Sequence, residues 1–287
     1  SLEPVLLGDP REIGSKAHAL KKPLDGIRLV DPAADETSQP LADAYQIQRP
    51  ETSRAIAVRL ARKPLFHAGL MLKTGTADAM VAGVTCLTAR VIEVAMMTIG
   101  LQPGIRVPSS FFLMIMPGTQ HCLIFADCAV NIDPGIDDLA AIGVASAHSC
   151  ARLLQEEPRT AFLSFSTHGS AQHELATRIR KAAELAQSLC PQFKFDGELQ
   201  ADAALVPRVA ALKLKALGDV AGRANVLVFP DLASANIGYK LVQHLGGAIA
   251  LGPFLQGFAA PVSDLSRGAT VQEIIDTAVM TAAAAVK

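Results

Sequence analysis

Ser266, Arg267 and Gly268 place a hydroxyl, a guanidinium and a flexible backbone in three consecutive residues. They stand just ahead of residues 271–286, whose apolar spacing predicts a helix. The first turn of a helix has unpaired N–H groups and a partial positive charge, and an arginine adds a planar fork that fits phosphate oxygens. The pattern predicts a site for a phosphate-bearing substrate, although a simple turn with a capping role would also explain these three residues.

Two other segments place hydroxyl groups and a glycine where a predicted strand leads into a helix. Residues 166–171 follow the apolar run 161–165, and residues 230–240 follow the run 225–229. Ligands of open α/β sheets collect beyond the carboxyl ends of the strands, so these loops could present N–H and hydroxyl groups to phosphate or carbonyl oxygens. Ser, Asn and Asp are also ordinary helix caps, and each segment alone is compatible with that simpler role.

The remaining motifs argue against several classes of protein. The chain has neither GxGxxG nor GxxxxGK[ST], which disfavours nicotinamide enzymes and nucleotide hydrolases. Its seven histidines show no HExxH or similar spacing, so we expect no metal site. Five cysteines without a CxxC pair argue against both a disulfide framework and a zinc knuckle. Cys122 and Cys128 lie in apolar surroundings and are predicted to be buried, inert thiols.

The composition predicts a globular chain of about two domains, because 287 residues, half of them hydrophobic, can bury a sizeable core in each. The net charge of −1 gives no electrostatic footprint for nucleic acid or for an anionic membrane surface. No apolar run reaches the ~18 residues of a membrane span, and Ser1-Leu2-Glu3 does not open a signal peptide. We therefore expect a cytoplasmic protein.

Short apolar runs alternate with helical stretches along the chain. Strands separated by helices indicate a mostly parallel sheet with helices on both faces. Only a short turn separates the runs 111–116 and 122–126, so this pair predicts an antiparallel hairpin. The predicted strands are 4–7, 27–30, 79–82, 111–116, 122–126, 161–165 and 225–229, and the predicted helices include 137–154, 171–189 and 235–245.

Four motifs resemble the successive signatures of the phosphate acetyltransferase family. Each is weak alone, but all four occur in the family's order and spacing, between residues 164 and 268. The similarity is strongest to the short, single-module bacterial type, which includes the enzymes of ethanolamine utilisation. The motifs are Ser-Phe-Ser-Thr-His-Gly-Ser-Ala at 164–171, Asp-Gly-Glu-Leu-Gln-Ala-Asp-Ala-Ala at 196–204, Phe-Pro-Asp at 229–231 with Asn-Ile-Gly-Tyr-Lys at 236–240, and Asp-Leu-Ser-Arg-Gly at 264–268.

The resemblance implies a fold, a reaction and partners. The implied fold has two α/β/α domains with mostly parallel sheets and an interdomain cleft; residues 1–103 with 256–287 form the first domain and 104–255 the second. The implied reaction is the reversible transfer of an acetyl group from acetyl phosphate to coenzyme A, giving acetyl-CoA and phosphate. Coenzyme A is then a substrate, no metal or other cofactor is needed, and we expect a homodimer. The strand that opens the family fold is missing before Ser1, so we expect a fragment, a shortened member or a module of a longer protein.

Carried onto this chain, the resemblance makes Ser266, Arg267 and Glu273 the catalytic residues. A thiol with a pKa near ~8.5 is mostly protonated at neutral pH, so a carboxylate that takes its proton would make the sulfur of coenzyme A a nucleophile. Arg267 would hold the phosphoryl group, and Ser266 would donate to an oxygen as charge develops on it. The implied substrate-binding residues are Arg90, Ser109, Ser110, Ser166, Thr167, Gly169, Ser170, Asn236, Tyr239 and Lys240.

Glu273 has a competing structural explanation. Residues 270–273 read Thr-Val-Gln-Glu, which is a capping box with a glutamate at N3 answering a threonine at the N-cap. A cap alone would account for the glutamate, so the residues themselves leave both roles open.

Glu93 departs from the family pattern. Members usually have an anion-binding arginine at the position that Glu93 occupies, and a carboxylate there would repel phosphate. Arg90, one helical turn earlier, could substitute, and Arg49 or Arg54 could supply a second family arginine. The reversed charge keeps open a second function, a non-catalytic acyl-CoA-sensing regulatory domain related to those of malic enzymes. The intact motif at 264–268 favours the enzyme.

Overall fold

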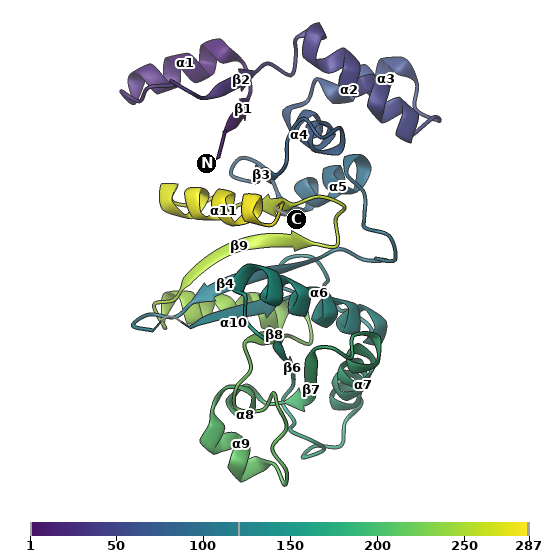
Figure 1. The fold of residues 1–287 in the computed structure, drawn as a ribbon, viewed down its shortest axis with the longest axis vertical. Coiled ribbons are helices and arrows are strands. Elements are labelled where there is room, and N and C mark those ends of the chain that lie inside the picture. The colour runs from purple at the N-terminus through teal and green to yellow at the C-terminus, as the bar shows by residue number, and fades with distance from the viewer. Residues whose placement is uncertain (1, 120, 286–287) are drawn as a thin grey trace.

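The computed structural model describes residues 2–119 and 121–285, which form an elongated α/β molecule (Figure 1). The last predicted helix ends at Ala283, and its predicted end at residue 286 lies outside the described residues. No described helix combines the length and the apolar content needed to cross a bilayer. The helices are α1 (Pro10–Ala19), α2 (Asp35–Gln48), α3 (Arg54–Ala61), α4 (Pro64–Lys73), α5 (Thr88–Thr98), α6 (Ile136–Leu154), α7 (Glu174–Leu189), α8 (Ala201–Leu205), α9 (Pro207–Lys213), α10 (Leu232–His244) and α11 (Val271–Ala283).

The strands form one large sheet and one small one. The strands are β1 (Val5–Leu7), β2 (Arg28–Val30), β3 (Met80–Ala82), β4 (Ser109–Ile115), β5 (Cys122–Ala126), β6 (Arg159–Leu163), β7 (Lys194–Leu199), β8 (Val226–Val228), β9 (Ile249–Gln256) and β10 (Val262–Asp264). The large sheet has the order β3-β10-β9-β4-β5-β8-β6-β7, and β1 pairs with β2. Among the described strands, five of the eight pairings are parallel. The predicted α/β class with a mostly parallel sheet is confirmed, and so is the antiparallel hairpin of β4 and β5.

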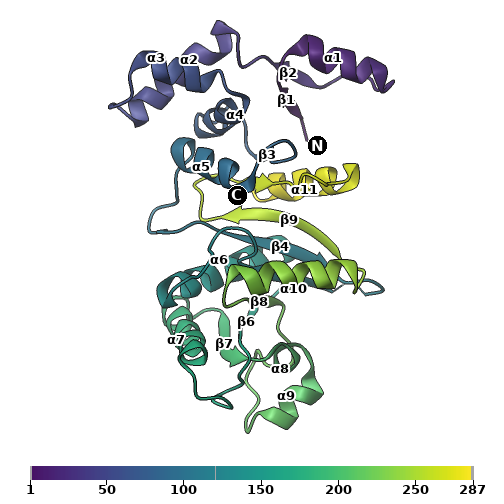
Figure 2. The ribbon, with the colours of Figure 1, turned by 180° about the vertical axis from the view of Figure 1, so that it is seen from behind.

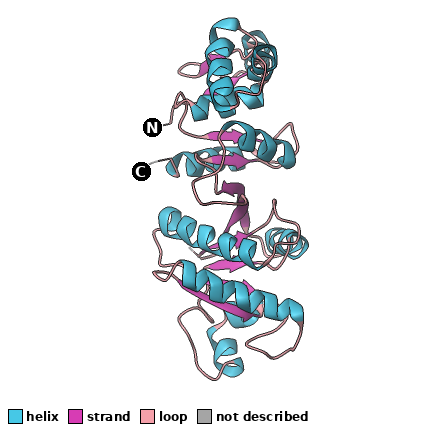
Figure 3. Ribbon diagram, turned by 90° about the vertical axis from the view of Figure 1, so that its right-hand side faces the viewer, coloured by secondary structure: helices cyan, strands magenta, loops and turns pink. Residues whose placement is uncertain are grey.

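Alternate residues of β4 enter two cores on opposite faces of the sheet, as the two-residue period of a strand requires. Phe112 and Met114 pack in a cluster with Tyr239 of α10. Phe111 and Leu113 pack in a cluster with residues of α6 and α7. Figure 1 shows α6 in front of the sheet, Figure 2 shows α10 in front when the molecule is seen from behind, and Figure 3 shows helices on both sides of the strands.

A further core brings the C-terminal part of the chain back to the β3 end of the sheet. Leu255 and Val262 pack with Met80 and Val91, and α11 contacts β3, β9 and β10. One sheet runs through the molecule, because β9 pairs with β10 on one side and with β4 on the other. The domain boundaries predicted from the resemblance stay a prediction.

Three strands of the large sheet are absent from the sequence prediction. β9 contains Pro253, which normally argues against a central strand. The sheet accommodates it because the β4 register shifts between Phe111 and Leu113, opposite Gly252 and Pro253. β10 has only three residues, and β7 interrupts its apolar residues with Lys194, Asp196 and Glu198, so neither presents a continuous apolar run.

Candidate functional site

The loops after β3 and β10 leave the sheet side by side, because the two strands are parallel neighbours with Ala82 opposite Asp264. The first loop leads into α5 and the second into α11. The second loop changes from buried at Leu265 to exposed at Ser266. Two helix N-termini, each with a partial positive charge, therefore begin at this edge of the sheet beside the Ser-Arg-Gly motif.

Ser266 and Arg267 form an exposed turn. The N–H of Gly268 donates to Ser266 Oγ at 3.3 Å, and the N–H of Ala269 donates to the Ser266 carbonyl at 3.0 Å. Within residues 2–119 and 121–285, the Arg267 guanidinium has no hydrogen bond or ion pair to another side chain or carbonyl. An exposed arginine without a protein partner keeps all its donors for an anion.

Glu273 forms the predicted capping box of α11. Its Oε2 accepts from the Thr270 N–H at 2.7 Å, and the Glu273 N–H donates to Thr270 Oγ1 at 3.2 Å. The structural role predicted for this glutamate is therefore confirmed in its geometry. A proton-accepting role would require the carboxylate to serve a substrate beside, or in place of, the Thr270 N–H.

Asp264 closes β10 directly before the exposed turn and is 1% exposed. Thr88 Oγ1, in the first turn of α5, donates to Asp264 Oδ2 at 2.5 Å. Burial raises the pKa of Asp264, and the Thr88 hydrogen bond opposes that rise. This aspartate begins the Asp-Leu-Ser-Arg-Gly motif, but a local pattern predicts no role for it, because its partner lies 176 residues away in the chain.

The cysteines do not offer a nucleophile at this edge. Cys86 is half-buried beside Asp264, and burial together with the charge of Asp264 raises the pKa of its thiol. Cys128 is buried as predicted, whereas Cys122 is only half-buried. Burial raises the pKa of Cys150 to about 12. In the part of the chain that the structure describes, no group of three His, Cys, Asp or Glu side chains could hold a metal ion.

Arg90 and Glu93 lie on the first two turns of α5. Arg90 Nη1 is 2.6 Å from Glu93 Oε2, and the Arg90 guanidinium also lies over the Phe66 ring at 5.5 Å from its centre. The other two candidate arginines have partners elsewhere. Arg49 Nε donates to the Met97 carbonyl at the far end of α5, and Arg54 pairs with Asp43 of α2.

A buried carboxylate, for which the sequence predicted no role, organises the predicted Ser166–Ser170 loop. Glu198 is completely buried; its Oε1 accepts from Ser166 Oγ at 2.9 Å and from the Gly169 N–H at 2.7 Å. Ser170 Oγ accepts from the Thr167 N–H. Ser166 and Thr167 are buried, whereas Gly169 and Ser170 are exposed.

Ser109 and Ser110, at the start of β4, are also buried. Ser110 Oγ donates to the buried Asp127, whose carboxylate also accepts from the N–H groups of residues 129–131. Ser109 Oγ accepts from Gln256 Nε2 at 3.3 Å. In this structure both hydroxyls serve the protein interior, and their predicted substrate contacts stay untested.

The residues predicted on α10 point in different directions. The Tyr239 ring stacks on Phe112 in the core, with 4.2 Å between ring centres. Lys240 is exposed, with Nζ 5.0 Å from the centre of the Tyr239 ring, and Asn236 is half-buried.

The predicted site residues fall into two groups, which lie at opposite ends of the strands of the large sheet. Three antiparallel pairings, β10 with β9, β9 with β4 and β4 with β5, make β10 run against β5, β8 and β6. The structure therefore groups Ser266, Arg267 and Glu273 with the start of α5 and Arg90. The Ser166 loop and the start of β4 lie at the opposite strand ends of the sheet. No hydrogen bond or ion pair among the described residues joins the two groups.

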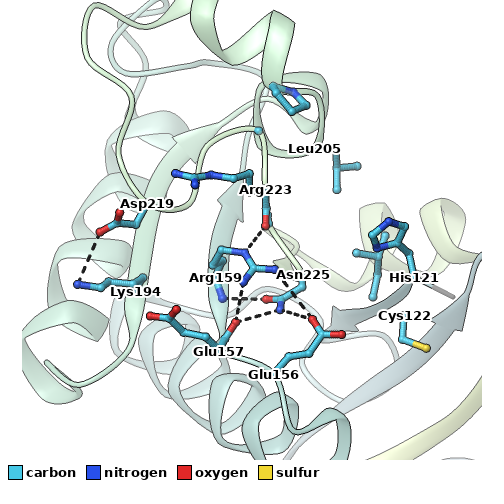
Figure 4. Close-up of a pocket in the computed structure, with 14 residues that line it drawn as sticks. His121, Cys122, Glu156, Glu157, Arg159, Lys194, Leu205, Asp219, Arg223 and Asn225 are labelled. Carbon is cyan, nitrogen blue, oxygen red and sulfur yellow. Dashed lines mark hydrogen bonds and ion pairs between the residues drawn. The ribbon is translucent and has the colours of Figure 1, made fainter.

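Two cavities lie away from the Ser266 turn. One, of about 650 Å³, lies at the amino ends of β5, β6, β7 and β8 (Figure 4). Its basic residues Arg159, Lys194 and Arg223 are balanced by three acidic ones, so it has no charge preference for an anion. The other, of about 490 Å³, is lined by Gly169 and Arg180 among others and adjoins the Ser166–Ser170 loop.

Comparison with known proteins gives one consistent result. The family model described as "Phosphate acetyl/butaryl transferase" matches residues 2–282. A phosphate acetyltransferase of Thermoanaerobacterium thermosaccharolyticum is 44% identical, over 97% of this chain and 86% of the relative. The corresponding protein of Clostridium acetobutylicum is 40% identical, over 97% and 85%. Among solved structures, the EutD phosphotransacetylase from Staphylococcus aureus superposes with a TM-score of 0.91 at 36% identity, over 99% of this chain and 86% of that one.

Proposed function

The chain belongs to the phosphate acetyl/butaryl transferase family, and we propose that the Ser266–Arg267 turn is where it carries out the family's acyl transfer. The enzyme transfers an acetyl group between acetyl phosphate and coenzyme A, giving acetyl-CoA and phosphate. The enzymatic reading of the sequence is therefore confirmed. The alternative of an acyl-CoA sensor gains no support from the relatives above, which are named as transferases.

The observation that carries the site assignment is the exposed guanidinium of Arg267, which has no hydrogen-bond or ion-pair partner within residues 2–119 and 121–285. It lies on the loop that leads into α11, next to the loop that leads into α5. A phosphoryl group carries oxygens that match the planar guanidinium fork, and two helix N-termini add partial positive charge. The substrate phosphate would therefore bind at Arg267, with its acyl carbon facing Ser266.

In the proposed reaction, Glu273 takes the proton of the coenzyme A thiol as the sulfur attacks the acyl carbon. A carbon–sulfur bond forms, the carbon–oxygen bond to phosphate breaks, and phosphate leaves with the electron pair of that bond. Ser266 Oγ–H donates to the oxygen on which negative charge develops, and Arg267 stabilises the departing phosphate. The position of Glu273 in the first turn of α11, directly after the loop that holds Ser266, supports this role.

Arg90 is the proposed second phosphate ligand, and its ion pair with Glu93 limits that role, since the carboxylate already satisfies part of the guanidinium. The predicted contacts of Ser109, Ser110, Ser166, Thr167, Gly169, Ser170, Asn236, Tyr239 and Lys240 with substrate remain proposals. Of these, Gly169, Ser170 and Lys240 are exposed, which suits them best to bind coenzyme A. Coenzyme A enters as substrate, and we propose no other cofactor.

We also propose a cytoplasmic homodimer. Five free thiols favour a reducing compartment. Ile237 and Leu241 of α10 and Leu245, which caps its C-terminus, form an exposed apolar stripe, at 59%, 52% and 82% exposure, and a second copy would bury it. Light scattering of the purified chain tests the dimer, and a monomer at working concentration would contradict it.

The acyl transfer is tested by following acetyl-CoA formation from acetyl phosphate and coenzyme A, and the reverse reaction with added phosphate. The same assay with propionyl and butyryl phosphate ranks the acyl groups. Turnover with acetyl phosphate is expected. Tight binding of acetyl-CoA without any turnover would instead support the sensor.

A further inference from the structure

Asp264 links the proposed site to a distant part of the chain. It stands two residues before Ser266, is 1% exposed, and accepts a hydrogen bond from Thr88 Oγ1 at 2.5 Å. Thr88 is the first residue of α5, so one contact fixes the end of β10 to the start of that helix. The second carboxylate oxygen, Oδ1, is buried and makes no well-aligned hydrogen bond within residues 2–119 and 121–285, although the nearby Leu265 N–H acts to lower the pKa of Asp264.

Gly83 makes the same junction tight from the other side. Its φ of +116° is a backbone conformation that favours glycine. A Cβ at this position would overlap Asp264 Oδ1 and would lie 2.5 Å from the Leu265 backbone nitrogen. The turn after β3 therefore packs directly on the residues that precede Ser266, with no side chain between them.

The burial of Asp264 is unfavourable for the stability of the fold. Burying a carboxyl group with one poorly satisfied oxygen costs free energy, which the Thr88 hydroxyl and the Leu265 N–H only partly offset. The N-cap of α5, Leu87, supplies no side-chain cap, and Asp264 contacts the first residue of this helix, where the helix carries a partial positive charge. Groups held at such a cost cluster at functional sites.

We propose that Asp264 is a positioning residue, which acts through Thr88 to hold the Ser266–Arg267 turn in its reactive place beside α5. This inference rests on the proposed function of that turn. Acyl transfer needs the thiol, the acyl carbon and the phosphate ligand aligned, and a displacement of about 1 Å can cost ~10²-fold in rate. Without the Thr88 bond, Asp264 would be left with a buried, unsatisfied carboxyl, and the turn would shift to reach other donors.

The test compares two substitutions at position 88. Thr88→Val removes the hydroxyl and keeps the shape, and we expect kcat to fall ~10- to 100-fold while the KM for coenzyme A changes little. Thr88→Ser keeps the hydroxyl and should restore kcat to within about threefold of the parent. Thr98→Val is the matched control, because Thr98 is a buried threonine at the other end of α5 whose hydroxyl donates to the Val94 carbonyl at 2.7 Å. It should lower the melting temperature without lowering kcat.

Three results would overturn the inference: parental kcat in folded Thr88→Val, equal loss of kcat in Thr88→Val and Thr98→Val, or failure of Thr88→Ser to rescue. Arg267→Ala, assayed in parallel, separates this inference from the proposed function. If Arg267→Ala is impaired while Thr88→Val is not, only the positioning role fails. If Arg267→Ala has parental kinetics, the site assignment itself fails. In the double variant of Thr88→Val and Arg267→Ala, the Thr88→Val change should lower kcat much less than it does in the parent, because both residues act through the same turn.

Discussion

Arg90 and Glu93 form an ion pair along one face of α5, with 2.6 Å between Nη1 and Oε2. The side chains are 39% and 53% exposed, so solvent screens the pair and its contribution to stability is small. Its effect on function differs, because Glu93 stands where the family resemblance of the sequence implies an anion-binding arginine. The carboxylate occupies Arg90 and, at the proposed site, would place negative charge near the substrate phosphate.

Replacing Glu93 should therefore improve the binding of acetyl phosphate. Glu93→Arg should lower the KM for acetyl phosphate by roughly two- to tenfold, an effect that matches an exposed charge interaction. Glu93→Gln frees Arg90 without adding a cation and should give a smaller decrease. Steady-state kinetics with varied acetyl phosphate measures both. Equal KM values in the parent and both variants would show that Glu93 does not act on the substrate.

Arg267→Ala should weaken the use of acetyl phosphate far more than it weakens the fold. The guanidinium is exposed and has no protein partner among the described residues, so its removal should change the free energy of unfolding by less than about 0.5 kcal/mol. Loss of a charged donor at the reacting phosphate should lower kcat/KM ~10²- to 10³-fold. Arg208→Ala, which removes an exposed arginine of α9, is the control and should keep parental kinetics.

The sequence predicted the strands that are continuous apolar runs. The β4 and β5 runs are continuous and apolar, and both were predicted with their hairpin. β9 was missed because Pro253 contradicts the usual strand pattern, and only the register shift in β4 reconciles it with the sheet. Local patterns also do not give the strand order. In the sheet, β9 and β10, which come late in the chain, lie between β3 and β4.

The site shows the same division between local and long-range information. The Ser266–Arg267 turn and the capping box of Glu273 could be predicted, because both lie within a few residues of a helix start. The roles of Asp264 and Glu198 could not, because each depends on a partner brought near by strand pairing. The division of the predicted residues between opposite strand ends of the sheet likewise follows from strand directions that no local pattern contains.

Asp264 predicts a pH dependence of stability. Its pKa is raised by burial in the folded protein, so between the unfolded and folded pKa values the folded state binds more protons than the unfolded state. The free energy of unfolding should therefore fall as pH rises through that window, and the loss should persist above it. Asp264→Asn removes the titration. Its stability relative to the parent should increase as pH rises from below the usual aspartate range toward neutral. Denaturant unfolding at a series of pH values checks this, and parallel profiles for the two proteins would contradict it.

Glu273→Gln separates the two roles of Glu273. Glutamine also completes a capping box, so the variant should keep the bond from the Thr270 N–H and melt within a few degrees of the parent. Glutamine cannot accept the thiol proton, so turnover should fall ~10²- to 10⁴-fold while coenzyme A binding is largely kept. The control is Asp138→Asn, the same acid-to-amide change at N3 of α6, which should leave turnover at the parental level. If Glu273→Gln turned over within about threefold of the parent, the base role would be excluded and Glu273 would be a cap only.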